Sequence, residues 1–195
     1  LHRASGEVSV RTAGPDGTLG APVFLSTSTS GPGNTGQAPS GMTTADVNND
    51  ERPDMLTANL GFGGYGSISV MLAKEDGTYE PARTFTSGGG MFAISAADFD
   101  NDGNMDVVAG LFDCRVAFFR GDGTVTFAYE SRVMVTGDFD QDGDTDIAGA
   151  GYSGDMVTLE NRGAATAAGW SKRVYPAPSG AHGTHRIGIS NVNAD

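Results

Sequence analysis

The sequence has little of what marks several common classes of protein. A single cysteine, Cys114, excludes a disulfide within the chain, and its apolar neighbours indicate a packed thiol. No apolar run approaches the roughly 20 residues that span a bilayer, so we expect no membrane insertion. Only 12 lysines and arginines, without a basic stripe, argue against a nucleic-acid partner. The absence of helical periodicity, together with 30 glycines, is typical of a turn-rich β protein.

Acidic residues are abundant, and they gather in short loops. The net charge is −12, and half of the 24 acidic residues are aspartates in residues 46–54, 98–106 and 138–146. In each segment Asp or Asn occupies positions 1, 3 and 5, and Asp occupies position 9. A fourth copy begins at residue 191, so the copies start 52, 40 and 53 residues apart. This recurrence indicates a repeated structural unit.

The loop of residues 98–106 combines carboxylates with a turn. Asp98, Asp100 and Asp102 have the spacing of the first ligands of an EF-hand calcium loop, and Gly103 stands where that loop needs a positive φ. Asp106 then leads into a β-like run, whereas an EF-hand ends with Glu on a helix. Clustered carboxylates repel one another unless a cation lies between them, and oxygen donors without His or Cys favour calcium. An isolated cluster of this kind is more often a solvated turn, so the repetition carries the prediction.

Strand-like segments surround every acidic loop. One precedes each loop, a second follows it, and a third and a fourth are joined by an Asp-Gly-Thr hairpin signal at 76–78 and 122–124. The N-terminal residues 7–11 and 15–18 repeat the third strand and its hairpin. Four strands in each unit of 40 to 53 residues are typical of a propeller blade. The predicted first strands are 41–45, 92–97 and 132–137, and the predicted third strands are 67–72, 115–119 and 156–159.

We therefore expect an all-β fold, a β-propeller of four-stranded blades with about four repeats in one domain, residues 1–195. The two ends of the chain are consecutive parts of one unit. Either they complete one blade together, or the chain is an excerpt from a longer array; the cut inside an acidic loop favours the excerpt. The expected blade units are about 1–40, 41–90, 91–130 and 131–186, with 187–195 starting the next.

The loop motif resembles that of FG-GAP/VCBS repeats. Residues 99–110, residues 138–149 and the Gly-Asp-Gly-Thr turn at 121–124 carry the resemblance, which extends over nearly the whole chain. Such repeats form the β-propeller of integrin alpha subunits and of many secreted bacterial and fungal proteins. The resemblance implies a propeller, usually seven-bladed, that binds Ca²⁺ between the first two strands of a blade.

A set of calcium ligands follows from the same resemblance. It includes the main-chain carbonyls at position 7 of each loop, Arg52, Asn104 and Asp144. In the first loop Glu51 replaces glycine, at a strain of about 1 kcal/mol, and Asn48 removes a charge, so we expect the weakest binding there. The remaining predicted ligands are Asp46, Asn48, Asp50 and Asp54; Asp98, Asp100, Asp102 and Asp106; Asp138, Asp140, Asp142 and Asp146; and Asn191, Asn193 and Asp195 of the incomplete fourth loop.

Other motifs have plainer explanations than the functions they suggest. The tripeptide Arg120-Gly121-Asp122, which integrins bind, belongs to a repeated hairpin. His182 and His185 lie in a Gly/Ala-rich stretch typical of a surface loop, and nothing resembles a nucleophile with its base, so we predict no enzyme activity. Trp170 could stack on a sugar, although ordinary packing is the simpler interpretation.

The predicted function is that of a calcium-binding extracellular module for binding or scaffolding. Calcium sites of micromolar to millimolar affinity stay filled only outside the cytosol, which indicates a secreted or cell-surface protein. Its partner is an unidentified protein or glycan. Two alternatives stay open, namely a structural unit that assembles with copies of itself by blade completion, and an accessory domain of a secreted carbohydrate-active enzyme.

Overall fold

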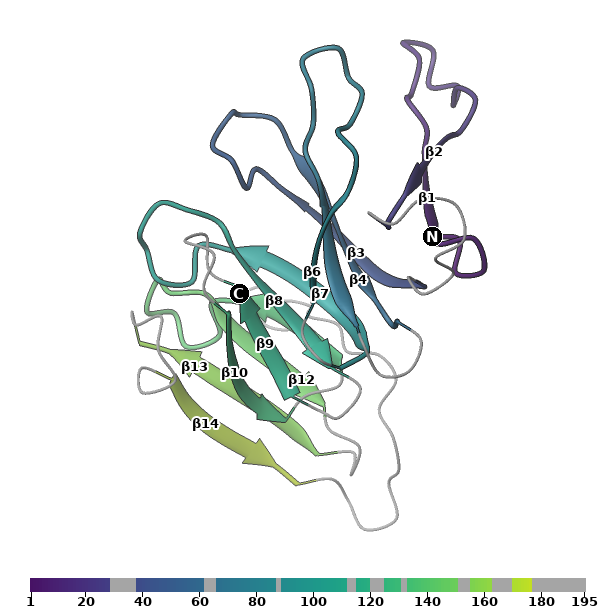
Figure 1. Cartoon of the computed structure of the whole chain (residues 1–195). Coiled ribbons are helices and arrows are strands. Elements are labelled where there is room, and N and C mark those ends of the chain that lie inside the picture. Colours follow the sequence, from purple (N-terminus) through teal and green to yellow (C-terminus); the bar gives the residue numbers. More distant parts are fainter. Residues whose placement is uncertain are drawn as a thin grey trace. The chain divides into compact units, whose positions relative to one another are not determined.

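The computed structural model describes residues 1–28, 38–61, 66–86, 89–111, 115–119, 125–130, 133–150, 155–162 and 170–176. Within these ranges the chain forms fourteen β-strands and no helix (Figure 1). The strands make three antiparallel sheets of four strands and one of two. The predicted all-β class is therefore confirmed, whereas ring closure and the number of blades stay predictions. Nothing in the described part has the length and apolarity of a helix that crosses a membrane.

The chain divides into two compact units, Leu1–Ile94 and Ser95–Asp195. In the first unit a two-stranded sheet precedes a four-stranded one, and within each sheet every strand pairs with the next along the chain. This order is the one expected when short turns connect neighbouring strands. The strands of the two sheets are β1 (Glu7–Val10) and β2 (Val23–Ser26), then β3 (Pro39–Ala45), β4 (Asp54–Asn59), β5 (Ser67–Met71) and β6 (Arg83–Thr86).

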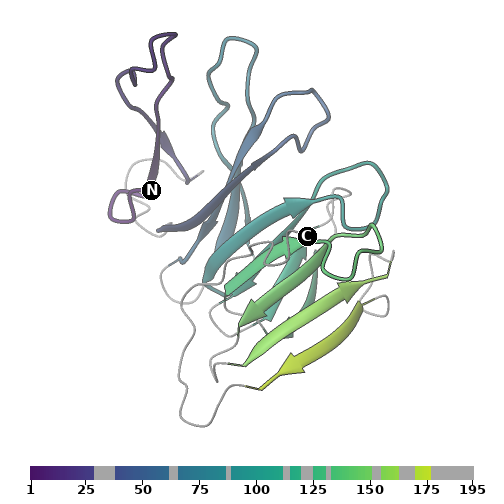
Figure 2. The same ribbon diagram turned by 180° about the vertical axis from the view of Figure 1, so that it is seen from behind.

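The second unit contains two further sheets with the same sequential order, although β7 begins within the first unit. Figure 2 shows them from behind, with β14 in yellow-green at the edge of its sheet. The strands of one sheet are β7 (Met91–Ala97), β8 (Asp106–Leu111), β9 (Arg115–Phe119) and β10 (Val125–Glu130). Those of the other are β11 (Val133–Gly137), β12 (Asp146–Ala150), β13 (Met156–Asn161) and β14 (Trp170–Tyr175).

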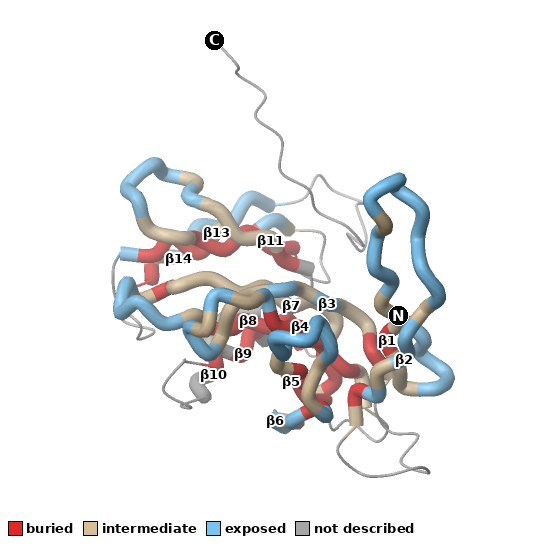
Figure 3. The backbone as a smooth tube through the Cα atoms, turned by 90° about the horizontal axis from the view of Figure 1, so that it is seen from above, coloured by how far each residue is buried: buried red, intermediate tan, exposed pale blue. Residues whose placement is uncertain are grey.

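Burial depends on the place of a strand within its sheet. Every residue of β4, β8 and β12, the strands that follow the acidic loops, is buried, whereas β2 and β6 are mostly exposed. Figure 3 shows this contrast, with buried residues in red at β4 and β8 and exposed residues in pale blue at β6. A strand that is covered on both faces has no polar side, which explains why these segments show no apolar-polar alternation in the sequence. The acidic loops therefore lead directly into buried strands.

A small apolar cluster joins the two sheets of the first unit. Val8 of β1 packs with Met55 of β4 and Met71 of β5, and all three side chains are at most 3% exposed. The burial of each such side chain contributes about 1.5 to 3 kcal/mol. A polar contact lies near this junction, since the buried hydroxyl of Ser69 donates to the carbonyl of Thr27. The two-stranded sheet is thus held to its neighbour by both kinds of contact.

The hairpins predicted from Asp-Gly-Thr are present where the structure describes them. Gly17 and Gly77 both have φ of 78°, in the left-handed region that favours glycine. In each turn one carboxylate oxygen, of Asp16 or Asp76, accepts from both the amide and the hydroxyl of the following threonine. The turn at 122–124 lies outside the described residues.

Candidate metal-binding loops

The three complete acidic loops share one backbone conformation. Positions 4 and 6 have positive φ in every copy. The expected left-handed residue at position 6 is confirmed, and it includes Glu51 at 65°. The left-handed residue at position 4 was not predicted; asparagine tolerates this region, but the glutamine of the third copy gives no such signal. These φ angles are 58°, 56° and 64° for Asn49, Asn101 and Gln141, and 87° and 97° for Gly103 and Gly143.

The aspartate at position 1 organises each loop from within. Asp98 accepts the amide of Asp102 at 3.1 Å with one carboxylate oxygen and the amide of Gly103 at 2.9 Å with the other. Asp46 and Asp138 make the corresponding pairs of hydrogen bonds. Because these hydrogen bonds form between residues of one loop, they stabilise the turn conformation of that loop.

The aspartate at position 9 fastens the loop to the sheet. Asp54 and Asp146 are fully buried, and Asp106 is 3% exposed. One oxygen of Asp146 accepts the amide of Phe139 at 2.7 Å, and the other accepts the amide of Asn161 at 2.7 Å. Asp54 accepts from Val47 and Ala73 in the same way. A buried carboxylate needs such partners, so this aspartate has a structural role whether or not a metal is bound.

Two sets of carboxylates converge. Oxygen atoms of the aspartates at positions 1, 3 and 9 lie within 4.8 Å of one another in two loops. The sets are Asp98, Asp100 and Asp106, and Asp138, Asp140 and Asp146. Asp102 and Asp142 lie outside these sets, and each accepts the amide of the residue at position 7. A donor set made only of oxygen suits a hard cation, so each set could hold a metal ion.

The charges within the third loop are poorly balanced without a cation. Desolvation raises the pKa of Asp140 above its ordinary value, and the negative charges of Asp142 and Asp146 raise it further. Like charges held close together disfavour ionisation, and a cation between them would reverse that effect. The electrostatics of the loop therefore fit a bound cation.

The two loops of the second unit are connected through Asn161. Its side-chain amide donates to the carbonyl of Phe99, in the loop of residues 98–106, at 2.6 Å, while its backbone amide binds Asp146 of the other loop. A second link runs from the Asn101 side chain to the Asp144 carboxylate at 2.6 Å. Sequence reasoning missed Asn161; its only signal is an amide at the end of the strand Met156–Asn161.

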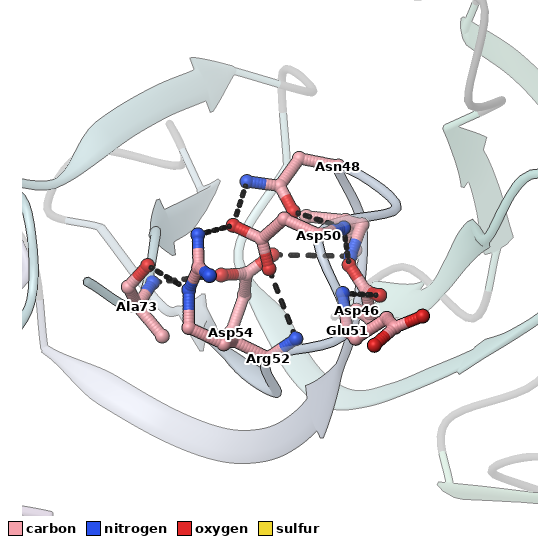
Figure 4. A network of polar contacts seen from close by, with 8 residues as sticks. Asp46, Asn48, Asp50, Glu51, Arg52, Asp54 and Ala73 are labelled. Atoms are coloured by element: carbon pink, nitrogen blue, oxygen red, sulfur yellow. Dashed lines mark hydrogen bonds and ion pairs between the residues drawn. The ribbon is translucent and has the colours of Figure 1, made fainter. Parts of the chain in front are cut away.

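The first loop has a different arrangement of charges. It contains neither of the two converging sets found in the described residues. Its Asp50 carboxylate pairs with the Arg52 guanidinium at 2.6 Å (Figure 4). Desolvation raises the pKa of Asp50, but hydrogen bonds from Asn48 and Arg52 and the charge of Arg52 lower it below its ordinary value. The sequence prediction assigned to Arg52 only a carbonyl ligand.

Several predicted residues are not described. The incomplete fourth loop, Asn191, Asn193 and Asp195, lies outside the described residues, as do Cys114, the tripeptide at 120–122 and both histidines of the stretch 182–185. Trp170 is described. It is 8% exposed, with its ring centroid 6.0 Å from that of Phe99, so packing accounts for this side chain.

Comparison with known proteins gives one finding that bears on these loops. A search of curated proteins found no match. A family model described as FG-GAP-like repeat matches residues 46–109. The matched segment begins at the first aspartate of one acidic loop and contains the whole of the next, together with β4 to β7 and most of β8. Residues 46–109 of this chain are therefore similar to an FG-GAP-like repeat, as the loop motif predicts.

Proposed function

We propose that this chain is a calcium-binding β-propeller module that acts outside the cell, where it binds a protein or glycan ligand or serves as a scaffold. The observation that carries the proposal is the convergence of three aspartates in each of two loops. The FG-GAP-like repeat supports it, because such repeats are typical of extracellular proteins and often bind calcium. Calcium is proposed over other metals because the donors are carboxylate oxygens.

The proposed role of calcium is structural. Asp98, Asp100 and Asp106 would hold one ion, and Asp138, Asp140 and Asp146 another. The aspartate at position 9 begins a buried strand, so an ion bound to it would tie the loop to the sheet. Metal binding energy then becomes folding energy. We propose no enzyme activity, since the carboxylates of the loops would be occupied by the metal and by backbone amides.

Calcium titration with thermal unfolding tests this proposal. We expect calcium to stabilise the protein by about 2.7 kcal/mol per site at a hundred times the dissociation constant. The double variant Asp100→Asn and Asp140→Asn should lose most of that gain. Asparagine is compatible with position 3, because Asn48 occupies it in the first loop and accepts the amide of Asp50 at 3.3 Å. A wild-type unfolding curve that calcium does not move would contradict the proposal.

A second candidate function is assembly between copies of the chain. It is favoured by the sheet of β1 and β2, which has two strands in the described residues while the other three sheets have four. Strands from another copy could complete it. Native mass spectrometry should then show calcium-dependent oligomers that vanish when residues 187–195 are removed. A protein that stays monomeric at all calcium concentrations would contradict assembly, and the binding module would then be the remaining proposal.

A further inference from the structure

The first acidic loop has the backbone of a metal loop but a different set of charges. Its positive φ angles, the two hydrogen bonds to Asp46 and the buried Asp54 reproduce the features of the other two loops. Backbone conformation therefore does not distinguish it from them. Apart from Glu51 in place of glycine at position 6, the difference lies in the side chains at positions 3 and 7, Asn48 and Arg52, where the loop of residues 98–106 has Asp100 and Asn104.

Both exceptional side chains donate to the same carboxylate. Arg52 Nη2 lies 2.6 Å from Asp50 Oδ2, and Asn48 Nδ2 lies 2.8 Å from the same oxygen (Figure 4). Arg52 Nε also donates to the carbonyl of Ala73 at 3.4 Å. That residue follows β5, and its own amide binds Asp54. The guanidinium thus joins the loop to the sheet, the task expected of a metal ion in the other loops.

Access to solvent does not explain why this loop would lack a metal. The side chains of Arg52 and Asp50 are 37% and 21% exposed, and both line a hollow of about 500 Å³. A calcium ion could reach the carboxylate. It would have to displace a guanidinium that already neutralises Asp50, and it would find an amide where the other two loops have an aspartate.

We infer that the loop of residues 46–54 takes no calcium, because the Arg52 side chain supplies the positive charge in its place. The chain then contains two kinds of acidic loop on one backbone plan. In one kind the cation is exchangeable and in the other it is covalently part of the chain. The inference rests on the proposed function for the behaviour of the other two loops, but the role of Arg52 can be tested by itself.

Exchange of residues between loops tests the inference. Native mass spectrometry at saturating calcium should find one more bound ion in the double variant Asn48→Asp and Arg52→Asn than in the wild type. The matched control, Asp100→Asn with Asn104→Arg, should bind one ion fewer. Equal numbers of bound ions in the wild type and the first variant would overturn the inference. Sites outside the described residues do not affect this test, because it uses only the difference in ion number between the two proteins.

Amide hydrogen exchange separates this inference from the proposed function. In chelator, Arg52→Asn should speed exchange at the backbone amides of residues 50–52 severalfold, and in the wild type calcium should leave these amides unchanged. Calcium should slow the corresponding amides of residues 102–104. If no loop responds to calcium, the proposed function fails, and the Arg52→Asn result still decides the role of the guanidinium. Slower exchange at residues 50–52 when calcium is added to the wild type would overturn the inference.

Discussion

Single aspartates perform different tasks at different positions of one loop. At position 1 the carboxylate shapes the loop, at position 3 it adds a converging charge, and at position 9 it is a buried anchor. Asp146 illustrates the last task, since it accepts amides from two segments, Phe139 and Asn161, while fully buried. The acidic motif is therefore partly a structural motif, and a change within it need not act through metal.

Substitution of the buried aspartate at position 9 should lower the free energy of unfolding more than substitution of the exposed aspartate at position 5. Asp146→Ala leaves two backbone amides without their acceptor, so we expect a loss of about 2 to 4 kcal/mol in chelator. Asp142→Ala removes one acceptor in an exposed part of the loop and should cost under about 1 kcal/mol. Urea unfolding of both variants measures the difference. Equal losses would show that Asp146 acts mainly through metal or not at all.

The hairpin aspartates predict a pH effect of known sign. Hydrogen bonds from the side chain and backbone of Thr78 lower the pKa of Asp76 below its ordinary value of 3.8. A lowered pKa means that the folded state binds this proton less strongly than the unfolded state. The contribution of Asp76 to stability is thus fully present above the ordinary pKa and is lost as pH falls through the folded value.

Asp76→Ala isolates this contribution. The variant should be less stable than the wild type near about pH 6, and the gap should be smaller at a pH below the ordinary value of 3.8, because the contribution is lost as pH falls through the lowered pKa of the folded state. Denaturant unfolding at both pH values measures the gap. Asp16→Ala should behave alike, because Thr18 lowers the pKa of Asp16 in the same manner. A gap that widened as the pH fell would contradict the assignment.

At the scale of the strand, close approach between chain segments limits which residues fit. Gly66 precedes β5, and a Cβ placed there would lie 2.0 Å from the carbonyl oxygen of Gly89. The nearest atoms all belong to the backbone of Gly89 and Gly90, so no flexible side chain can yield. Gly66 therefore reflects packing between segments rather than the need for an unusual φ.

Gly66→Ala should destabilise the first unit by about 1 to 3 kcal/mol through overpacking. Gly20→Ala is a suitable control, because its Cβ would meet its nearest neighbour, an oxygen of Thr12, at 3.4 Å, an ordinary contact. Thermal unfolding of both variants compares them. Equal destabilisation by the two substitutions would mean that the segments at Gly66 and Gly89 can move apart at little cost in stability.

The sequence allowed most strands to be predicted because local signals define them. The predicted strand at 92–97 corresponds to β7, Met91–Ala97, and the one at 67–72 corresponds to β5, Ser67–Met71. What sequence reasoning missed is non-local or ambiguous. The bond between Asn161 and Phe99 joins residues 62 positions apart, and the direction of the Arg52 side chain depends on its contact with Ala73. Neither leaves a periodic pattern.

On the scale of the whole chain, the two kinds of acidic loop fall in different compact units. The loop with Arg52 belongs to Leu1–Ile94, and both converging sets of aspartates belong to Ser95–Asp195. A charge that is part of the chain cannot be removed by a chelator. Dependence on metal should therefore be unequal along the sequence.

Limited proteolysis with and without chelator tests that inequality. We expect chelation to speed cleavage within the second unit severalfold and to leave the first unit nearly unchanged. In the double variant Asn48→Asp and Arg52→Asn, chelation should speed cleavage within the first unit as well. Equal acceleration in both units would contradict a division between metal-dependent and metal-independent loops.

The bond network around Asn161 has a consequence for how the chain responds to its surroundings. Asn161 binds both loops of the second unit, through its side-chain amide to Phe99 and through its backbone amide to Asp146. An ion bound in either loop, as proposed above, would therefore lower the entropy cost of binding at the other. Two such sites fill over a narrower range of concentration than independent ones. If calcium fills both proposed sites, the second unit would respond to its concentration as a threshold, rigid above a given calcium level and loosened below it.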